Sequence, residues 1–304
     1  MKNILYIEPR NSDSQYLYYT YIGKALGERK DIKLTVGSNL FRYNLDQYDL
    51  ILLGYGACAG EFPDQQLNTK TPIIAFLFKL SNHQASKINF FKRNNINIYS
   101  QHTRIPEFED KFNIKINSIL YPIDMNIFKP YDIDKDHDVG MTGALHDIAH
   151  YSSSAYVDGE KNIRQRIVNT LNDTTFKKII QCSDVNQKAY IKDTKEYINT
   201  INRCKIWVCT NADHGDLTPR YSEIMSCKTL LFCNEQPYDT FSDTLIDNET
   251  CVFFKNDLSD LEEKITYFAS DISECQRISG NAYEMYKSNF SSVKFAENII
   301  RQYT

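Results

Sequence analysis

The sequence lacks the short motifs that identify several large enzyme classes. No GxxxxGK[ST], HExxH or GxSxG stretch occurs, so nothing supports a P-loop ATPase, a zinc metalloprotease or an α/β-hydrolase. None of the eight cysteines belongs to a CxxC pair, so no pattern of a structural zinc site or a thioredoxin-like motif is present. No apolar run approaches the roughly 20 residues of a membrane span, and the run before Glu8 is too short for a signal peptide. These absences favour a reduced, cytoplasmic protein without a membrane span.

The chain also has no large excess of positive or of negative charge. The net charge of −4 gives no electrostatic reason to expect binding to nucleic acid or to an anionic membrane surface. The chain is long and is rich in aromatic side chains. The 304 residues fit two domains of about 150 residues each. The 21 tyrosines suit half-polar clefts, because a tyrosine packs and forms hydrogen bonds at once.

Two segments resemble ligand-binding motifs but lack essential parts. Gly54–Gly60 follows an apolar run, yet its glycine spacing is one residue longer than GxGxxG and no acidic residue follows about 20 residues on, which argues against NAD. The acidic stretch Asp132–Asp138 lies between the two halves of the chain, where acidic side chains are usually solvated. We therefore expect no metal site and no bound cofactor.

Short apolar runs alternate with amphipathic stretches through the whole chain, a pattern typical of parallel β-sheets flanked by helices. The fold class expected is α/β, with two Rossmann-like domains facing across a cleft. Expected strands of the first half are Ile4–Ile7, Ile32–Val36, Leu50–Leu53, Ile73–Phe78, Ile96–Tyr99 and Ser118–Leu120, with helices at Ser14–Glu28 and Asn82–Asn94. The second half repeats the rhythm, with strands at Val139–Thr142, Phe176–Cys182, Lys205–Cys209, Thr229–Cys233 and Cys251–Phe254 and helices at Lys161–Leu171, Gln187–Ile201, Pro219–Cys227 and Leu258–Phe268.

A proline-containing acidic stretch without helical period separates the halves. It predicts a first domain over residues 1–121, a linker over 122–137, a second domain over 138–288 and a C-terminal helix over 289–304 that packs back onto the first domain. In open parallel sheets, ligands bind outside the carboxyl ends of the strands. The loops after strands are therefore where functional residues are expected.

The most informative of these loops leads into the helix predicted at Pro219. Thr218 is a suitable N-cap and Pro219 suits the first helical position. A helix N-terminus carries partial positive charge and can hold a diphosphate, to which Arg220 can add a bidentate contact. Glu223, one turn further, can accept hydrogen bonds from both hydroxyls of a ribose. The alternative is a capped helix on which Arg220 and Glu223 form a surface ion pair.

The run TPRYSEIMSCKTLLFCNE resembles the donor-binding segment of GT-B glycosyltransferases, and it is most similar to glycosyltransferase family 4 and the spore-maturation-type glycosyltransferases. Thr218, Arg220, Glu223 and Glu235 match the order of a (T)xRxxE helix followed by a strand and an acidic turn. Two further patches are similar to parts of the family. Leu120–Pro130 looks like its hinge, in which a proline, an aspartate and FxP follow in this order, and Asp138–Leu145 looks like the first strand and glycine loop of its donor domain.

The resemblance implies a function and roles for particular residues. It implies transfer of a sugar from a UDP- or GDP-sugar to a hydroxyl of a glycan or other acceptor, without a required metal. The acceptor would bind the first domain and the nucleotide-sugar the second. Residues implied to bind the donor are Thr142, Gly143, Ser183, Asp184, Thr218, Arg220, Tyr221 and Glu223.

The sequence also departs from the family pattern. Lys228 stands where a glycine is usual, and Gly215 stands where retaining enzymes of family 4 carry a second glutamate eight residues before Glu223. The second departure leaves open whether the enzyme retains or inverts the configuration of the sugar. It also keeps open an alternative of another class, a GT-B domain that binds a nucleotide-sugar or glycan without turnover. A nucleotide-sugar epimerase is the other alternative.

The catalytic base is less clearly marked. Inverting GT-B enzymes often take it from a loop of the first domain, which makes Asp13 the first candidate, followed by His102 and His83. A carboxylate or imidazole suits this role when it lies within hydrogen-bond reach of the acceptor hydroxyl. The alternatives are that Asp13 caps a helix and that His102 is an ordinary loop histidine.

Overall fold

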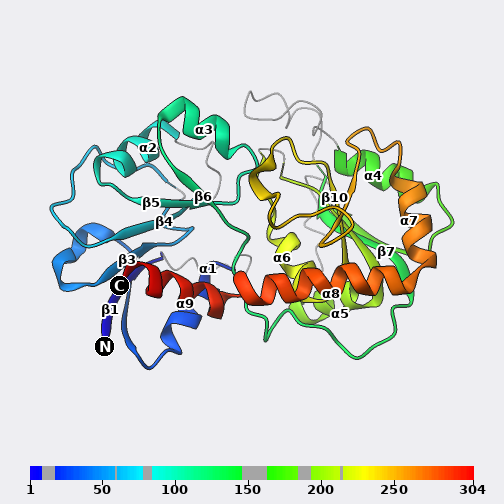
Figure 1. The fold of residues 1–304 in the computed structure, drawn as a ribbon, viewed down its shortest axis with the longest axis horizontal. Helices are drawn as coiled ribbons and strands as arrows, with labels where there is room; N and C mark the ends of the chain where they lie inside the picture. The colour runs from blue at the N-terminus through cyan, green and yellow to red at the C-terminus, as the bar shows by residue number, and fades with distance from the viewer. Residues whose placement is uncertain (9–17, 59, 78–83, 146–162, 184–192, 213–214) are drawn as a thin grey trace. The chain divides into compact units, whose positions relative to one another are not determined.

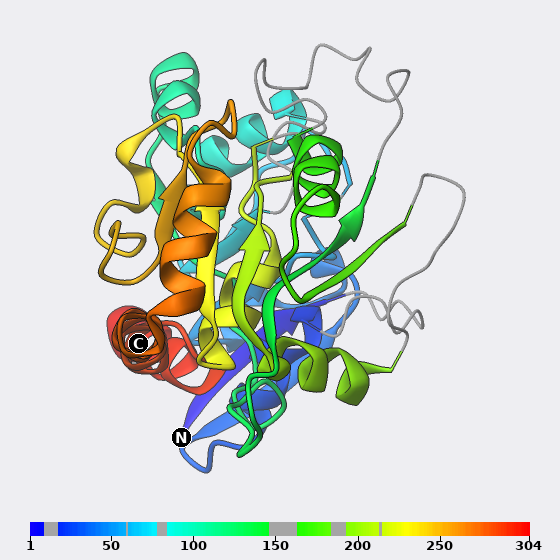
Figure 2. The same ribbon diagram turned by 90° about the vertical axis from the view of Figure 1, so that its right-hand side faces the viewer.

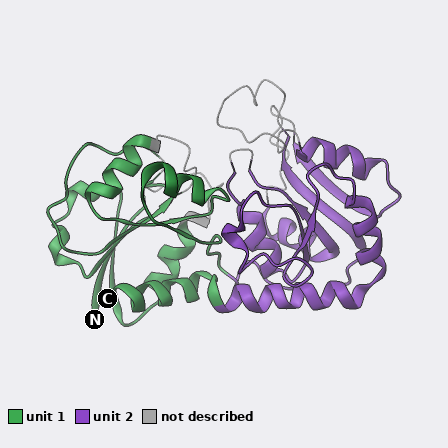
Figure 3. Ribbon diagram, turned by 45° about the horizontal axis from the view of Figure 1, so that its top comes forward, with its two compact units in different colours: residues 1–124, 289–304 green, residues 125–288 purple. Residues whose placement is uncertain are grey.

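The computed structural model describes residues 1–8, 18–58, 60–77, 84–145, 163–183, 193–212 and 215–304 (Figure 1). They form two compact units, coloured separately in Figure 3. Unit 1 comprises Met1–Asp124 and Asn289–Thr304, and unit 2 comprises Met125–Ser288. Each unit is built around one parallel β-sheet, which confirms the predicted α/β class. Among the described helices, none is long and apolar enough to cross a membrane.

Unit 1 contains a six-stranded sheet in the order β2-β1-β3-β4-β5-β6. Its strands are β1 (Lys2–Ile7), β2 (Ile32–Gly37), β3 (Leu50–Leu53), β4 (Ile73–Leu77), β5 (Asn97–Ser100) and β6 (Ile116–Ser118). All neighbouring strands are parallel. The last strand was expected at 118–120 and ends instead at Ser118.

Helices cover both faces of this sheet, because successive side chains of a strand point to opposite faces. Helices α2 (Gln84–Arg93) and α3 (Ile105–Phe112) pack on the face that carries Leu5, Ile51 and Ile73. Helices α1 (Tyr18–Gly27) and α9 (Ser292–Tyr303) pack on the other face. There the ring of Phe295 in α9 lies edge-on to Phe76 of β4, at 5.4 Å between centroids.

Unit 2 contains a five-stranded parallel sheet in the order β11-β10-β9-β7-β8. Its strands are β7 (His137–Ala144), β8 (Lys178–Ser183), β9 (Cys204–Cys209), β10 (Leu230–Asn234) and β11 (Val252–Phe254). Its helices are α4 (Ile163–Asn172), α5 (Thr194–Arg203), α6 (Pro219–Ser226), α7 (Leu261–Ser270) and α8 (Ile272–Asn289). Figure 2 shows helices on both sides of this sheet.

The two faces of the second sheet have different partners. The alternate residues Val139, Met141, Ile206 and Val208 pack against α4 and α7. The residues between them face α5 and α6, and Trp207 is the largest of these. Thr142 and Cys209 lie on this second face, so strand alternation alone directs them toward the helix that was predicted to bind the donor.

Residues 125–136, predicted to be part of a linker, pack onto unit 2. The backbone N–H of Tyr131 donates to Asn202 Oδ1 at 2.8 Å. The half-buried Lys135 ammonium donates to the carbonyl oxygens of Asn202 and Cys204 and to Thr229 Oγ1, at 2.8 to 3.2 Å. Lys135 thus joins the acidic stretch to the start of β9, and Asp136 and Asp138 add ion pairs to Arg203 and Lys205.

Candidate functional site

Polar residues end four neighbouring strands of unit 2. We call the carboxyl ends of β7, β8, β9 and β10 the second-sheet edge, and it carries Thr142, Ser183, Thr210, Asn211 and Asn234, all of them buried. Parallel strands end at the same edge of a sheet, so these groups converge on one region. Asp184 was predicted to join them and lies outside the described residues, as do Asp13 and His83 of the first domain.

Helix α6 begins at Pro219, as predicted, with Thr218 in the N-cap position. The predicted cap is wrong in one respect, because the Thr218 side chain accepts no hydrogen bond from the first turn. Its hydroxyl lies instead 3.4 Å from Cys209 Sγ at the end of β9. This contact fixes the start of the helix against the sheet and leaves its first turn without a side-chain cap. A helix start of this kind is suited to bind an anion.

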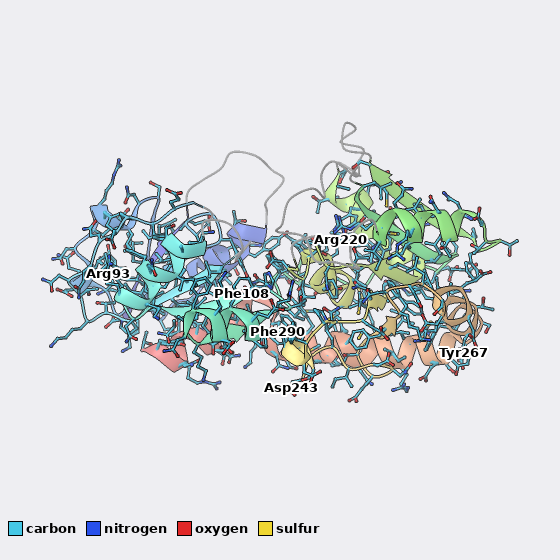
Figure 4. The ribbon with its side chains drawn as sticks, turned by 90° about the horizontal axis from the view of Figure 1, so that it is seen from above. Arg93, Phe108, Arg220, Asp243, Tyr267 and Phe290 are labelled. Atoms are coloured by element: carbon cyan, nitrogen blue, oxygen red, sulfur yellow. The ribbon has the colours of Figure 1, made fainter. Side chains whose placement is uncertain are left out.

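Arg220 projects from the first turn of α6 toward β7 (labelled in Figure 4). Its Nε donates to Thr142 Oγ1 at 3.3 Å. Arg220 forms no ion pair within the described part of the chain, so the predicted alternative of a surface pair with Glu223 is not found. A half-buried guanidinium without a carboxylate partner keeps its terminal N–H groups available for an anionic ligand.

Glu223 lies one turn further along α6 and is held from a different element. The hydroxyl of Tyr197 in α5 donates to Glu223 Oε2 at 2.8 Å. Burial raises the pKa of Glu223, whereas the Arg220 charge and the Tyr197 hydrogen bond counter this rise. The Tyr197 ring lies edge-on to Trp207, at 6.2 Å, and to Phe128, at 6.3 Å. The carboxylate is therefore oriented by an aromatic side chain that is itself packed on both sides.

Gly143 separates two guanidinium groups at the end of β7. Its φ of +156° favours glycine. A Cβ at this position would lie 3.4 Å from Arg164 Cδ and 3.9 Å from Arg220 Cζ. The glycine therefore keeps the backbone open beside both cations, which is the geometry that close approach of a phosphate requires.

Arg164 of α4 was not predicted from the sequence. Its three guanidinium nitrogens donate to Thr210 Oγ1, to the Ala144 carbonyl and to the Asn211 carbonyl, at 2.9 to 3.1 Å. It joins the ends of β7 and β9 and adds a buried positive charge whose hydrogen-bond partners are all neutral. The sequence does contain one indication of this role, because Arg164 stands on the apolar face of an amphipathic helix.

Tyr221 and Ser183 occupy supporting positions. Tyr221 is fully buried, and its hydroxyl donates to Asn211 Oδ1 at 2.9 Å. Asn211 Nδ2 in turn donates to Gln236 Oε1 at 3.0 Å. Ser183 ends β8 and is 3% exposed. The structure thus brings Thr142, Gly143, Arg220 and Glu223 together, with Tyr221 and Ser183 in buried positions at the same edge.

His102 belongs to unit 1, where it follows β5. Its Nδ1 accepts the backbone N–H of Arg104 at 3.1 Å, and its ring lies edge-on to Phe108 at 4.8 Å. An imidazole that accepts at Nδ1 carries its proton on Nε2 when it is neutral. In this tautomer Nε2 is a hydrogen-bond donor. The geometry therefore favours a role for His102 as a donor over its predicted role as a base.

Comparisons with known proteins gave one family match and several likenesses of fold. Residues 164–301 match the sequence model of a family described as glycosyl transferase-like. No match was found among curated proteins. The fold is similar to that of Anabaena HepE solved with UDP-glucose, with a TM-score of 0.59 at 11% identity over 99% of each chain.

Two further solved structures show the same likeness of fold. A sucrose-phosphate synthase from Thermosynechococcus elongatus has a TM-score of 0.60 at 10% identity, covering 100% of this chain and 98% of the other. AviGT4, a glycosyltransferase of avilamycin A biosynthesis, has a TM-score of 0.58 at 7% identity, covering 100% and 97%. The chain has the GT-B fold of these structures, with two parallel α/β sheets, and its residues 164–301 match the sequence model of the glycosyl transferase-like family.

Proposed function

We propose that the protein transfers a hexosyl or pentosyl group from a UDP- or GDP-sugar to a hydroxyl of a glycan or other acceptor, without a catalytic metal. One observation carries this proposal. Arg220 and Glu223 lie one turn apart on α6, do not pair with each other, and are each held by a residue of another element. A cation and a carboxylate at this spacing fit the diphosphate and the ribose of one nucleotide.

The proposed roles follow from the N–H groups of Arg220 and the lone pairs of Glu223 that the hydrogen bonds described above do not use. The terminal N–H groups of Arg220 bind the diphosphate, and the backbone of Gly143 allows it to approach. Glu223 Oε1 and the second lone pair of Oε2 accept the ribose hydroxyls. As the bond to the sugar breaks, negative charge develops on the leaving diphosphate, and Arg220 stabilises that charge. The UDP and UDP-glucose complexes of the HepE fold make a UDP-sugar the first donor to test.

Turnover with defined donors tests the proposal. The protein is incubated with UDP-glucose or GDP-mannose in EDTA, and released nucleotide is measured by anion-exchange chromatography. We expect release of UDP or GDP from one donor and its loss in Glu223→Gln. Nucleotide binding without release would instead favour the non-catalytic binding domain. Neither binding nor release with any nucleotide-sugar would contradict the donor site itself.

Tyr197→Phe is expected to weaken UDP binding about tenfold. The variant keeps the ring between Trp207 and Phe128 but removes the hydroxyl that orients Glu223, and a hydrogen bond to a charged group contributes about 1.5 to 3 kcal/mol. The pKa of Glu223 should rise, because the Tyr197 hydrogen bond lowers it. The carboxylate accepts ribose hydroxyls when ionised, so the loss of affinity on acidification should begin at higher pH in the variant.

Calorimetric titration with UDP between pH 5 and 8 measures both effects. Tyr267→Phe is the matched control, because Tyr267 is exposed on α7 of the same unit. An unchanged affinity and pH profile in Tyr197→Phe would show that Tyr197 has no positioning role.

A further inference from the structure

Thr142 lies near the end of β7, on the face of the second sheet that α5 and α6 cover. Its side chain points there because the neighbouring Met141 faces the opposite core. Thr142 is 8% exposed, and a hydroxyl that is buried to this degree normally has hydrogen-bond partners. One partner is Arg220 of α6, whose Nε donates to Thr142 Oγ1 at 3.3 Å. This bond uses a lone pair of Thr142 and leaves its hydroxyl proton for another group.

The second partner of Thr142 is the Tyr197 hydroxyl of α5, a helix that packs on β7. Burial raises the pKa of Tyr197 well above its ordinary value, and the Glu223 charge adds to the rise. The Arg220 charge and the hydrogen bond from Thr142 lower it. Tyr197 donates its own proton to Glu223 Oε2 at 2.8 Å, so toward Thr142 its oxygen is an acceptor.

The two ends of this chain of side chains fix the direction of every hydrogen bond in it. A guanidinium only donates and an ionised carboxylate only accepts. Arg220 therefore donates to Thr142, and Tyr197 donates to Glu223. Between them, the Thr142 proton is directed to the Tyr197 oxygen. Hydroxyls that donate and accept in one chain polarise each other, so each bond strengthens the next.

Glu223 is the group in this chain that titrates when the solution is acidified. The charged or titratable side chains around it are Arg220 and Cys227 on α6, Tyr197 on α5 and Cys209 on β9. Burial raises the pKa of both thiols and of the tyrosine, so all three stay neutral between pH 5 and 8. A change of UDP affinity with pH in this range therefore reports on Glu223 among these groups.

We propose that Thr142 is a positioning residue that holds Arg220 directly, and Glu223 through Tyr197, in the geometry that binds one nucleoside diphosphate. The inference rests on the proposed glycosyltransferase function, which assigns the diphosphate to Arg220 and the ribose to Glu223. The sequence resemblance implied that Thr142 contacts the donor itself. In the structure its hydroxyl is instead engaged with a side chain of α6 and a side chain of α5.

Thr142→Val tests this role by calorimetric titration with UDP between pH 5 and 8. Valine keeps the branched shape of the side chain and replaces the hydroxyl with a methyl group. We expect UDP affinity at pH 7 to fall about five- to tenfold, because two hydrogen bonds of the site are lost. The loss of affinity on acidification should also begin at higher pH, because a weaker bond from Tyr197 lets the pKa of Glu223 rise.

Two further variants and a control accompany this measurement. Thr142→Ser keeps the hydroxyl and should restore the affinity and the pH profile to near wild type. Thr142→Ala removes the hydroxyl without a methyl group beside Arg220, and it should shift the pH profile as Thr142→Val does. Thr266→Val, on the exposed side of α7, is the matched control, and thermal melts of all variants check the fold.

The double variant Thr142→Val/Tyr197→Phe shows whether the effect on Glu223 passes through Tyr197. Tyr197→Phe alone already removes the hydrogen bond to Glu223. Addition of Thr142→Val should therefore move the pH profile no further, so the two shifts are not additive. UDP affinity should still fall in the double variant, because Arg220 has lost its acceptor.

The possible outcomes separate this proposal from the proposed function. A wild-type pH profile in Thr142→Val and Thr142→Ala, an additive shift in the double variant, or no rescue by Thr142→Ser would overturn the role of Thr142. Each of these results would leave UDP binding by the wild type, and with it the donor site, intact. Absence of UDP binding by the wild-type protein would overturn the proposed function, and the role of Thr142 with it.

Discussion

Replacement of Arg220 by alanine is expected to lower kcat/KM for the nucleotide-sugar about 100- to 1000-fold. Removal of one preorganised donor from a developing negative charge costs about 2.7 to 4 kcal/mol of transition-state stabilisation. The side chain forms no ion pair with another described residue and gives one hydrogen bond to Thr142, so little native structure depends on it. The loss should therefore appear in catalysis and in UDP affinity rather than in the folded state.

Initial rates of nucleotide release and a thermal melt of the same preparation check this expectation. Arg220→Lys keeps the charge but loses the forked donor geometry, so an intermediate rate is expected. Arg277→Ala is the matched control, since Arg277 is an exposed arginine of unit 2 that pairs with Glu274. Wild-type UDP affinity in Arg220→Ala would contradict the placement of the diphosphate.

Gly140→Ala should destabilise the protein by about 2 kcal/mol. A Cβ at residue 140 would lie 2.4 Å from Trp207 Cε3 and 2.8 Å from Cys204 Sγ, well inside contact distance. Trp207 is fully buried between β7 and α5, so its ring has no free space into which to move. Its displacement would also disturb Tyr197 and, through Tyr197, the Glu223 carboxylate.

A thermal melt and the emission spectrum of the single tryptophan measure the effect. The midpoint should fall by about 4 to 8 °C, and the emission of Trp207 should shift to longer wavelength as its packing loosens. Gly280→Ala is the control, because its Cβ would lie 3.6 Å from the flexible Lys228 side chain, an ordinary contact, within a helix that favours alanine. Equal melting midpoints for the two variants would show that the close approach at Gly140 is not tight.

The sequence predicts those features that depend on local pattern. The alternation of apolar runs is enough to predict two parallel sheets. The start of α6 is predicted by the Thr-Pro pair before Arg220. The spacing of Arg220 and Glu223 places both on one helical face without any knowledge of the tertiary structure. The short helix α3 was missed, although its apolar residues Ile105, Phe108 and Phe112 stand at helical spacing.

The contacts that hold these side chains could not be predicted, because they join distant parts of the chain. Thr142 and Arg220 are separated by 78 positions, and Tyr197 and Glu223 by 26. The order of the strands in the sheet brings such residues together, and no local sequence pattern specifies that order. The same reason explains why Arg164 was overlooked and why Thr218 bonds to Cys209 instead of capping its helix.

Glu8 shows how tertiary burial changes the chemistry of a residue. In the sequence it is an acid at the start of a polar loop, and nothing separates it from Asp13. In the structure residues 54–56, which follow β3, enclose it and the pKa rises to about 8. Desolvation is a property of the packed fold, so it emerges only when the residues of β1 and β3 are seen side by side.

Calorimetric titration with UDP in EDTA, on the wild-type protein and on Glu223→Gln, tests the central claim most directly. Gln keeps the volume of the side chain and its contact with the Tyr197 hydroxyl but removes the charge that binds the ribose. The account predicts saturable binding by the wild type and at least about tenfold weaker binding by the variant, a difference of about 1.4 kcal/mol. Equal affinities, or no binding of UDP, GDP, ADP or CMP by the wild type, would contradict a nucleotide-sugar site on α6.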